Sequence, residues 1–139
     1  MLMADIKTKI YKDLDLTVHT VTGTPSVQDV CDELDQYYSD RYTKLILWDL
    51  TNADPSTWSG NEVMTLISKA KEYAHLRKDG KTAHVLSRDI DYGIARMYQA
   101  YSEIERFQFE VGVFRDMKEA LQWLGVPFIP DEKPKDAAI

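Results

Sequence analysis

The segment from Asp49 to Glu62, DLTNADPSTWSGNE, holds the residues whose types and spacing best suit a functional site. Ser59 precedes Glu62 by three positions, which is the S-x-x-E pattern of a capping box at the start of an α-helix. A serine there can simply cap the helix. It can also carry a phosphate, because the free N–H groups and the dipole of a helix N-terminus favour negative charge. Both interpretations of Ser59 are open.

The other reactive side chains form no pattern typical of an enzyme or a metal site. Asp49 with Asp54, and Asp89 with Asp91, are close in sequence, but no nucleophile or base accompanies either pair. The three histidines have no metal-ligand spacing, and neither HExxH nor CxxC occurs. The single cysteine, Cys31, is expected to be a small buried hydrophobe. We therefore assign no catalytic residue, metal or cofactor, and we expect a protein that is not an enzyme.

The composition is that of an ordinary globular protein with an acidic surface. The chain has 139 residues, 44% of them hydrophobic, and a net charge of −6. An acidic surface repels phosphate backbones, which disfavours nucleic-acid binding. No window approaches the roughly 18 apolar residues of a membrane span, and the first residues, MLMADIKTKI, lack the apolar region of a signal peptide. We expect one cytoplasmic domain without an integral membrane segment.

The first half of the chain has to place the segment 49–62 at the end of a strand. Residues 5–12 and 14–22 alternate between polar and apolar, which predicts a hairpin. The residues at 23–26 end the second strand and begin a helix. Thr24 or Ser26 is expected to cap this helix, which runs to about Tyr38. The run Leu45–Leu50 is apolar at consecutive positions, as in a strand buried on both faces.

The second half continues the alternation of helices and strands. The helix opened by Ser59 is predicted to end at Asp79-Gly80, where the glycine would take the left-handed conformation. The pattern then predicts a strand at 82–86, a helix at 92–104, a strand at 107–114 and a helix between Asp116 and Gly125. The order ββαβαβαβα predicts an α/β fold with a mostly parallel mixed sheet, helices packed against it and an antiparallel N-terminal hairpin. We expect the domain to cover 1–125 and residues 126–139 to form a partly mobile tail.

Basic residues gather at the end of the helix that Ser59 opens. They are Lys69, Lys71, His75, Arg77, Lys78 and Lys81. Positive charge is favoured near a helix C-terminus. The pattern therefore predicts a solvated helix surface, with contact to a partner or a membrane surface as the alternative.

Aromatic residues are frequent on the central segment and late in the chain. They are Trp48, Trp58, Tyr92, Tyr98, Tyr101, Phe107 and Phe109. Most are expected in the core. The remainder could form a homodimer face or line a pocket for an apolar small molecule.

Two parts of the sequence resemble the SpoIIAA-like family of small bacterial proteins. One is LWDLT at 47–51 followed by the capped helix, and the other comprises GKTAHVL at 80–86, YGIARMY at 92–98 and VFRDMKEALQWL at 113–124. That family is related to the STAS domain of anti-sigma-factor antagonists and sulfate transporters, and it resembles the lipid-binding CRAL-TRIO fold. The likeness covers roughly residues 4 to 125 and implies a single STAS-like domain.

The resemblance also implies where such a domain would act. In the antagonists, the loop after the central strand carries a D-S-S-G motif whose second serine is phosphorylated. That motif falls on Thr57-Trp58-Ser59-Gly60, where the second serine and the glycine match and the first two residues do not.

We therefore expect a non-enzymatic regulatory or binding module that contacts a protein partner, or a second copy of itself, through residues 51–60 and the following helix start. The predicted contact residues are Asp49, Thr51, Asp54, Thr57, Trp58, Ser59 and Gly60, with Ser59 as the position of a phosphate. The alternative is a small carrier for an apolar or lipid-like ligand in an aromatic-lined pocket.

Overall fold

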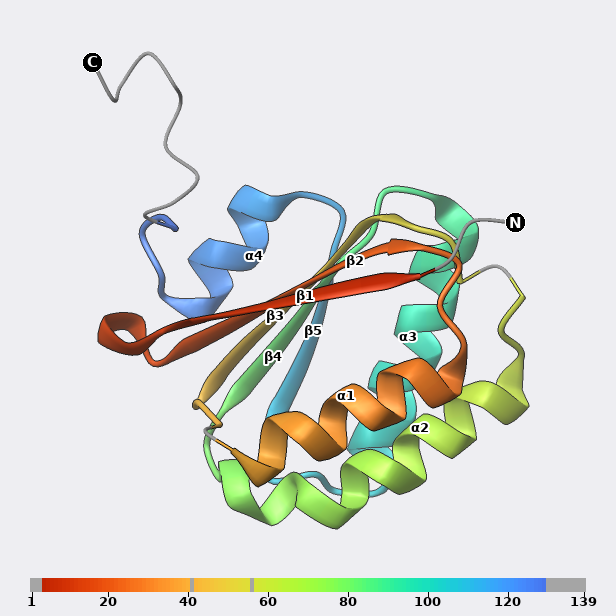
Figure 1. Ribbon diagram of the computed structural model, residues 1–139, viewed down its shortest axis with the longest axis horizontal. Coiled ribbons are helices and arrows are strands. Elements are labelled where there is room, and N and C mark those ends of the chain that lie inside the picture. The colour runs from red at the N-terminus through yellow and green to blue at the C-terminus, as the bar shows by residue number, and fades with distance from the viewer. Residues whose placement is uncertain (1–3, 41, 56, 130–139) are drawn as a thin grey trace.

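The computed structural model describes residues 4–40, 42–55 and 57–129, in which a five-stranded sheet lies between two layers of helices (Figure 1). The strands are β1 (Asp5–Tyr11), β2 (Leu16–Gly23), β3 (Leu45–Ala53), β4 (Lys81–Val85) and β5 (Glu110–Phe114). They lie in sequence order; β1 and β2 are antiparallel and each later pair is parallel. The helices are α1 (Val27–Ser39), α2 (Gly60–Tyr73), α3 (Asp89–Ile104) and α4 (Met117–Leu124). The predicted class, element order and antiparallel hairpin are confirmed.

The alternation of side chains along the strands divides the core into two parts. In β3, Ile46 and Trp48 belong to the cluster formed with α1, α2 and α3, whereas Leu47 belongs to the cluster formed with α4. Figure 1 shows α4 above the sheet and the other three helices below it. All three side chains are buried, so β3 is covered on both faces, as its consecutive apolar residues predicted.

Polar side chains cap three of the four helices at their N-termini. Ser26 begins α1 and Ser59 begins α2, each in a complete capping box, and Asp116 accepts a hydrogen bond from the N–H of Lys118 at the start of α4. Gly125 ends α4 in the left-handed conformation, with φ of 79°. These caps confirm the predicted starts of α1, α2 and α4.

The end of α2 differs from the prediction. The α-helix stops at Tyr73 and a 3-10 helix, Ala74–Arg77, follows it. The left-handed residue is Asp79, with φ of 66°, and not Gly80. Gly80 is required for another reason: a Cβ there would lie 2.5 Å from the carbonyl oxygen of Lys44 and 2.9 Å from that of Arg77.

Two element starts were also predicted wrongly. The helix α3 begins at Asp89 rather than at 92, because Asp89 and Asp91 lie in its first turn, where acidic side chains are favoured by the helix dipole. The strand β5 begins at Glu110 rather than at 107. The alternating residues before it form a connection in which the carbonyl of Gln108 accepts a hydrogen bond from the N–H of Asp79.

The prediction of a solvated basic surface was wrong for Arg77, which is buried, with 2% of its surface exposed. Its guanidinium donates to the backbone carbonyls of Thr43, Lys44 and Lys81 and to the hydroxyl of Thr82, at 2.6 to 2.9 Å. It also lies over the ring of Phe109, 4.7 Å from its centroid. Arg77 therefore ties the β3 and β4 starts to the end of α2.

The chain after α4 returns to the sheet. Val126 and Ile129 are buried in the α4-side cluster, whereas Phe128 is about half exposed. Of the tail predicted at 126–139, residues 130–139 lie outside the described part. Among the described residues, every helix is too short or too polar to cross a bilayer.

Candidate functional site

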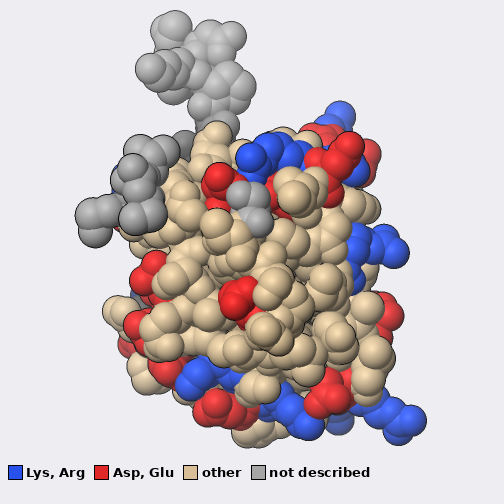
Figure 2. Space-filling view, turned by 90° about the vertical axis from the view of Figure 1, so that its right-hand side faces the viewer, with Lys and Arg blue, Asp and Glu red and all other residues tan. Residues whose placement is uncertain are grey.

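The predicted contact segment joins the end of β3 to the start of α2, at the edge of the sheet where the parallel strands finish. It lies on the right of Figure 1, and Figure 2 looks directly at that end of the molecule. Uncharged side chains make up most of the centre of this face, acidic oxygens show near its middle, and charged side chains lie around its margins (Figure 2). Ligands and partners of open α/β sheets usually bind at this edge.

Asp49 and Thr51 stabilise the irregular end of β3. One carboxylate oxygen of Asp49 accepts hydrogen bonds from the hydroxyl and the backbone N–H of Thr51, at 2.7 and 3.2 Å. The register between β2 and β3 shifts just here, between Thr20 and Thr22. Because Asp49 follows Trp48 in the strand, its side chain points to the opposite face of the sheet from Trp48.

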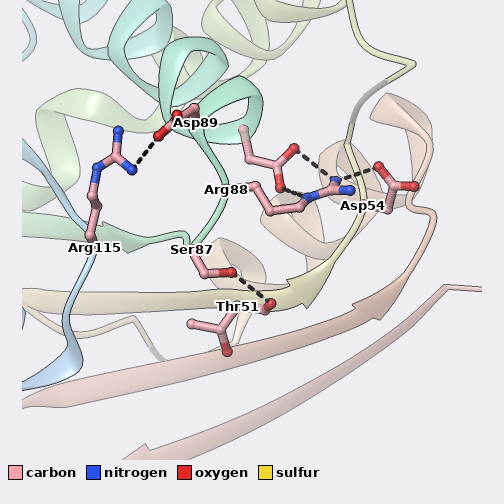
Figure 3. A network of polar contacts seen from close by, with 7 residues as sticks. Thr51, Asp54, Ser87, Arg88, Asp89 and Arg115 are labelled. Carbon is pink, nitrogen blue, oxygen red and sulfur yellow. Dashed lines mark hydrogen bonds and ion pairs between the residues drawn. The ribbon is translucent and has the colours of Figure 1, made fainter.

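Asp54 is held by Arg88, which bridges two loops at this edge (Figure 3). The guanidinium of Arg88 donates to Asp54 at 2.6 Å and to both carboxylate oxygens of the buried Asp91, at 2.7 and 3.0 Å. Hydrogen bonds to Asp91 and then to Asp54 raise the pKa of Arg88, so it stays charged. The loop after β3 is thereby tied to the first turn of α3.

A second set of contacts joins the neighbouring segments at this edge. The hydroxyl of Ser87 donates to the backbone carbonyl of Thr51 at 3.4 Å, and Arg115 forms an ion pair with Asp89 at 2.5 Å (Figure 3). The β3, β4 and β5 ends are thus linked by polar contacts through their following loops.

Trp58 is partly buried and fixes the loop to the segment before α1. Its indole N–H donates to the backbone carbonyl of Pro25 at 2.9 Å. The ring lines an apolar cavity between the sheet and the helices α1, α2 and α3, together with Pro55, Trp48 and His84. The ring of Trp58 therefore forms part of the cavity wall.

Ser59 and Glu62 form the predicted capping box. The carboxylate of Glu62 accepts hydrogen bonds from both the backbone N–H and the hydroxyl of Ser59, at 2.6 Å each. The Ser59 oxygen in turn accepts from the N–H of Asn61 at 3.3 Å. Hydrogen bonds from the Ser59 hydroxyl and N–H lower the pKa of Glu62, which keeps the carboxylate ionised beside Ser59.

The remaining predicted residues are two with exposed side chains and one glycine. Thr57 and Ser59, which precede and follow Trp58 in the sequence, are both exposed. Gly60 is the first residue of α2, and a Cβ there would meet nothing within 4 Å, so no close contact requires a glycine. Of the predicted set, Asp54, Thr57 and Ser59 lie on the loop, Asp49 and Thr51 pair with each other at the end of β3, and Trp58 lines the cavity.

Sequence reasoning missed the residues that hold the loop from outside it. Arg88 and Pro25 contact it directly, and Asp91 holds the guanidinium of Arg88; all three lie next to the loop only in the folded chain. Their role depends on which strands are neighbours, which no spacing along the chain reveals. The spacing of the histidines predicted no role for His84, and the structure places it in the wall of the cavity beneath the loop.

The described residues contain no group of three or more histidine, cysteine or acidic side chains placed to hold a metal ion. His19 and His84 are buried on the same face of the sheet, in register on either side of Trp48, and His19 lies 3.5 Å from the carboxylate of Glu33. His19 stacks on Trp48, with ring centroids 4.1 Å apart, and Cys31 is buried in α1.

The fold has counterparts among solved structures. A DUF3478-family protein with a SpoIIAA-like fold from Shewanella loihica PV-4 aligns with a TM-score of 0.56 and 16% identity, covering 87% of this chain and 93% of that one. An anti-sigma factor antagonist from Mycobacterium paratuberculosis aligns with a TM-score of 0.59 and 11% identity, covering 88% and 95%. Comparisons of the sequence with protein families and with curated proteins find no match. The chain therefore has a SpoIIAA-like fold, as the resemblance predicted.

Proposed function

Starting from a SpoIIAA-like fold, we propose that this chain is a cytoplasmic, non-enzymatic regulatory module that contacts a protein partner through residues 51–60 and the start of α2. One structure of the same fold is an anti-sigma factor antagonist, which supports a regulatory protein of this class. The observation that carries the proposal is an ordered loop on which Thr57 and Ser59 are exposed. Hydrogen bonds from Trp58 to Pro25 and from Arg88 to Asp54 hold this loop in place.

Rigidity is what makes the loop suitable for recognition. Trp58 holds it to the segment before α1, and Arg88 holds Asp54 to the start of α3. A surface ordered before binding loses less conformational entropy when the partner docks. Functional residues on loops positioned by a rigid scaffold are the common arrangement in proteins.

The charge distribution supports a protein partner over a nucleic acid. The net charge is −6, and the centre of the face at the strand ends is largely uncharged (Figure 2). Protein interfaces have few charged residues at their centre and a polar rim. The face matches that description.

Ser59 is the proposed regulatory position within this surface. Its hydroxyl is exposed at the N-terminus of a 14-residue helix, where a phosphate gains from the free N–H groups. The same hydroxyl donates to Glu62 at 2.6 Å, so a phosphate would repel that carboxylate and open the capping box. Phosphorylation would thus change both the charge and the local geometry of the contact surface.

Phosphopeptide mass spectrometry of the protein isolated from its native host tests the modification. We expect a phosphorylated peptide containing Ser59 in at least one growth condition. Its absence under all conditions, with good coverage of that peptide, would restrict Ser59 to capping and leave the contact surface to be tested separately.

Partner capture tests the contact surface. Thr57→Arg places a long charged side chain on the exposed edge of the loop, and Gln108→Arg makes the same change in charge at the opposite edge of the sheet. We expect the partner retained by wild-type protein and by Gln108→Arg to be lost from Thr57→Arg. Retention of every partner by Thr57→Arg, in a variant that melts at the wild-type temperature, would overturn the proposal.

A further inference from the structure

We propose that the cavity beneath the loop is a binding site for a small, ring-sized apolar molecule carrying one hydrogen-bonding group, which pairs with the imidazole of His84. The cavity lies beneath the proposed contact surface and shares Pro55 and Trp58 with its loop, but probe binding to the cavity can be measured without any partner.

The cavity lies between the sheet and its three-helix side, at the carboxyl edge of the strands. It has a volume of about 80 Å³. Its wall is formed by side chains from β3, β4 and the three helices, among them Trp48, Leu34, Val63, Leu86 and Tyr98. The cavity is partly open to solvent, and close-packed proteins hold few apolar spaces larger than a water molecule, so a space of this size indicates a place for a ligand.

His84 contributes a polar side chain to this wall. It is 9% exposed, and its Nδ1 is buried without a hydrogen-bond partner in the part of the chain that the structure describes. Its ring packs edge-on against Tyr98, with centroids 5.3 Å apart. Buried polar side chains are usually hydrogen-bonded, so an imidazole in an otherwise apolar wall favours a ligand that carries a hydrogen-bonding group.

Burial keeps this imidazole neutral, since it lowers the pKa of His84 to about 4. A neutral ring has one protonated nitrogen and one accepting nitrogen. The imidazole can therefore donate to a carbonyl through one nitrogen or accept from a hydroxyl or N–H through the other, and it offers no charge to an ionic ligand. The matching ligand is uncharged.

Water is a poor occupant of such a site. A buried water usually needs two to four polar partners, and His84 supplies one. One water needs roughly 10–15 Å³ measured in this way, so about 80 Å³ accommodates a molecule of roughly six to ten heavy atoms. That size excludes a long-chain lipid and fits one or two fused rings.

The outer wall belongs to the two segments that start α1 and α2. Pro25, Pro55 and Trp58 line the cavity there, and the Trp58 indole N–H donates to the Pro25 carbonyl at 2.9 Å. An occupant would lie against the Trp58 ring. The Trp58 N–H resonance is therefore a direct reporter of binding.

Three uncharged bicyclic probes test the chemistry: indene has no hydrogen-bonding group, indole has a donor and 1-indanone has an acceptor. Titration of isotope-labelled protein should give saturable shifts of the Trp58 indole N–H and the His84 ring nitrogens. We expect indole or 1-indanone to bind about five-fold more tightly than indene, which is the effect of one net hydrogen bond.

Two variants separate the cavity from other apolar surface. Ala95→Leu adds a larger side chain to the α3 wall of the cavity, whereas Ala100→Leu makes the same change at an exposed position of that helix. Ala95→Leu should abolish binding of all three probes and Ala100→Leu should leave it unchanged. His84→Leu should keep indene binding and remove the preference for the hydrogen-bonding probe.

The wild-type titration alone decides the proposal if a variant fails to fold. Lack of saturable shifts with every probe up to its solubility limit would overturn the site. Equal affinity for the three probes, without a shift at His84, would overturn the assigned ligand chemistry.

Discussion

Arg77 illustrates how a single residue takes its role from neighbours that are distant in sequence. The buried guanidinium donates to three backbone carbonyls and one hydroxyl, at the starts of β3 and β4. The sequence around it reads as a basic helix end, and for the neighbouring Lys78, which is exposed, that reading is correct. What distinguishes the two residues is which acceptors the folded chain brings within reach, and no local pattern contains that information.

Replacing Arg77 should therefore be much more harmful than replacing its neighbour. Arg77→Met keeps most of the stem but leaves buried carbonyls unpaired, and we expect it to lower the free energy of unfolding by about 3 kcal/mol. Lys78→Met, one residue later on the surface, should change it by less than about 0.5 kcal/mol. Urea unfolding of both variants measures this, and equal effects would contradict the anchoring role.

His84 should make stability depend on pH. Burial lowers its pKa from 6.5 to about 4, so the fold favours the neutral ring. Stability from this group is complete above pH 6.5, decreases as the pH falls through the window from 6.5 to 4, and then levels off. Between pH 7 and 5 the loss should be about 2 kcal/mol, since one pKa unit corresponds to about 1.4 kcal/mol.

Urea unfolding at both pH values checks this against His84→Gln, which does not titrate in the range. The wild type should lose more stability than the variant. A loss remains in the variant because burial also lowers the pKa of His19, an effect that its contact with Glu33 partly opposes. Identical pH profiles of the two proteins would show that His84 is not held neutral by the fold.

At the scale of elements, the start of α2 was predictable because its signals are local. The capping box needs only Ser59 and Glu62 three residues apart, and the structure contains both of its hydrogen bonds. The starts of α3 and β5 were predicted less well. The first turn of α3 is acidic rather than apolar, and Phe107 and Phe109 alternate like a strand although their backbone does not pair with β4.

Loss of the cap should weaken α2 by a modest and specific amount. Ser59→Ala removes the hydroxyl that accepts from the helix N-terminus and should cost about 1 kcal/mol. Ser68→Ala, at an exposed position inside the same helix, should be neutral or slightly stabilising because alanine favours a helix. Thermal unfolding compares them, and a Ser59→Ala variant as stable as Ser68→Ala would mean that the box contributes nothing.

Alanine substitutions at Gly60, the first residue of α2, and at Gly80, which lies after that helix, should have opposite effects on the free energy of unfolding. At Gly80, a Cβ would lie 2.5 Å from the carbonyl oxygen of Lys44, so Gly80→Ala must shift backbone and should cost about 2 kcal/mol. At Gly60 the space is open, and Gly60→Ala should be neutral or stabilise by about 0.5 kcal/mol. Urea unfolding of both variants tests the pair; comparable destabilisation by Gly60→Ala would contradict the open surroundings.

At the scale of the whole molecule, the fold was predictable to a greater extent than the site. The alternation of helices and strands identifies the α/β class, and the consecutive apolar residues of β3 indicate a strand covered on both faces. The sequence also locates the loop after β3. It does not show that Arg88 and Pro25 hold that loop, or that Trp58 and His84 line one cavity, because those contacts arise from the order of strands in the sheet.

The central claim is that residues 51–60 and the start of α2 contact a protein partner. Hydrogen–deuterium exchange of this chain, alone and in complex with the captured partner, tests it most directly. The proposal predicts that protection on binding is greatest in the peptides covering 51–62. Protection confined to other surfaces, such as α4 or the β1 edge, with 51–62 unchanged, would contradict it.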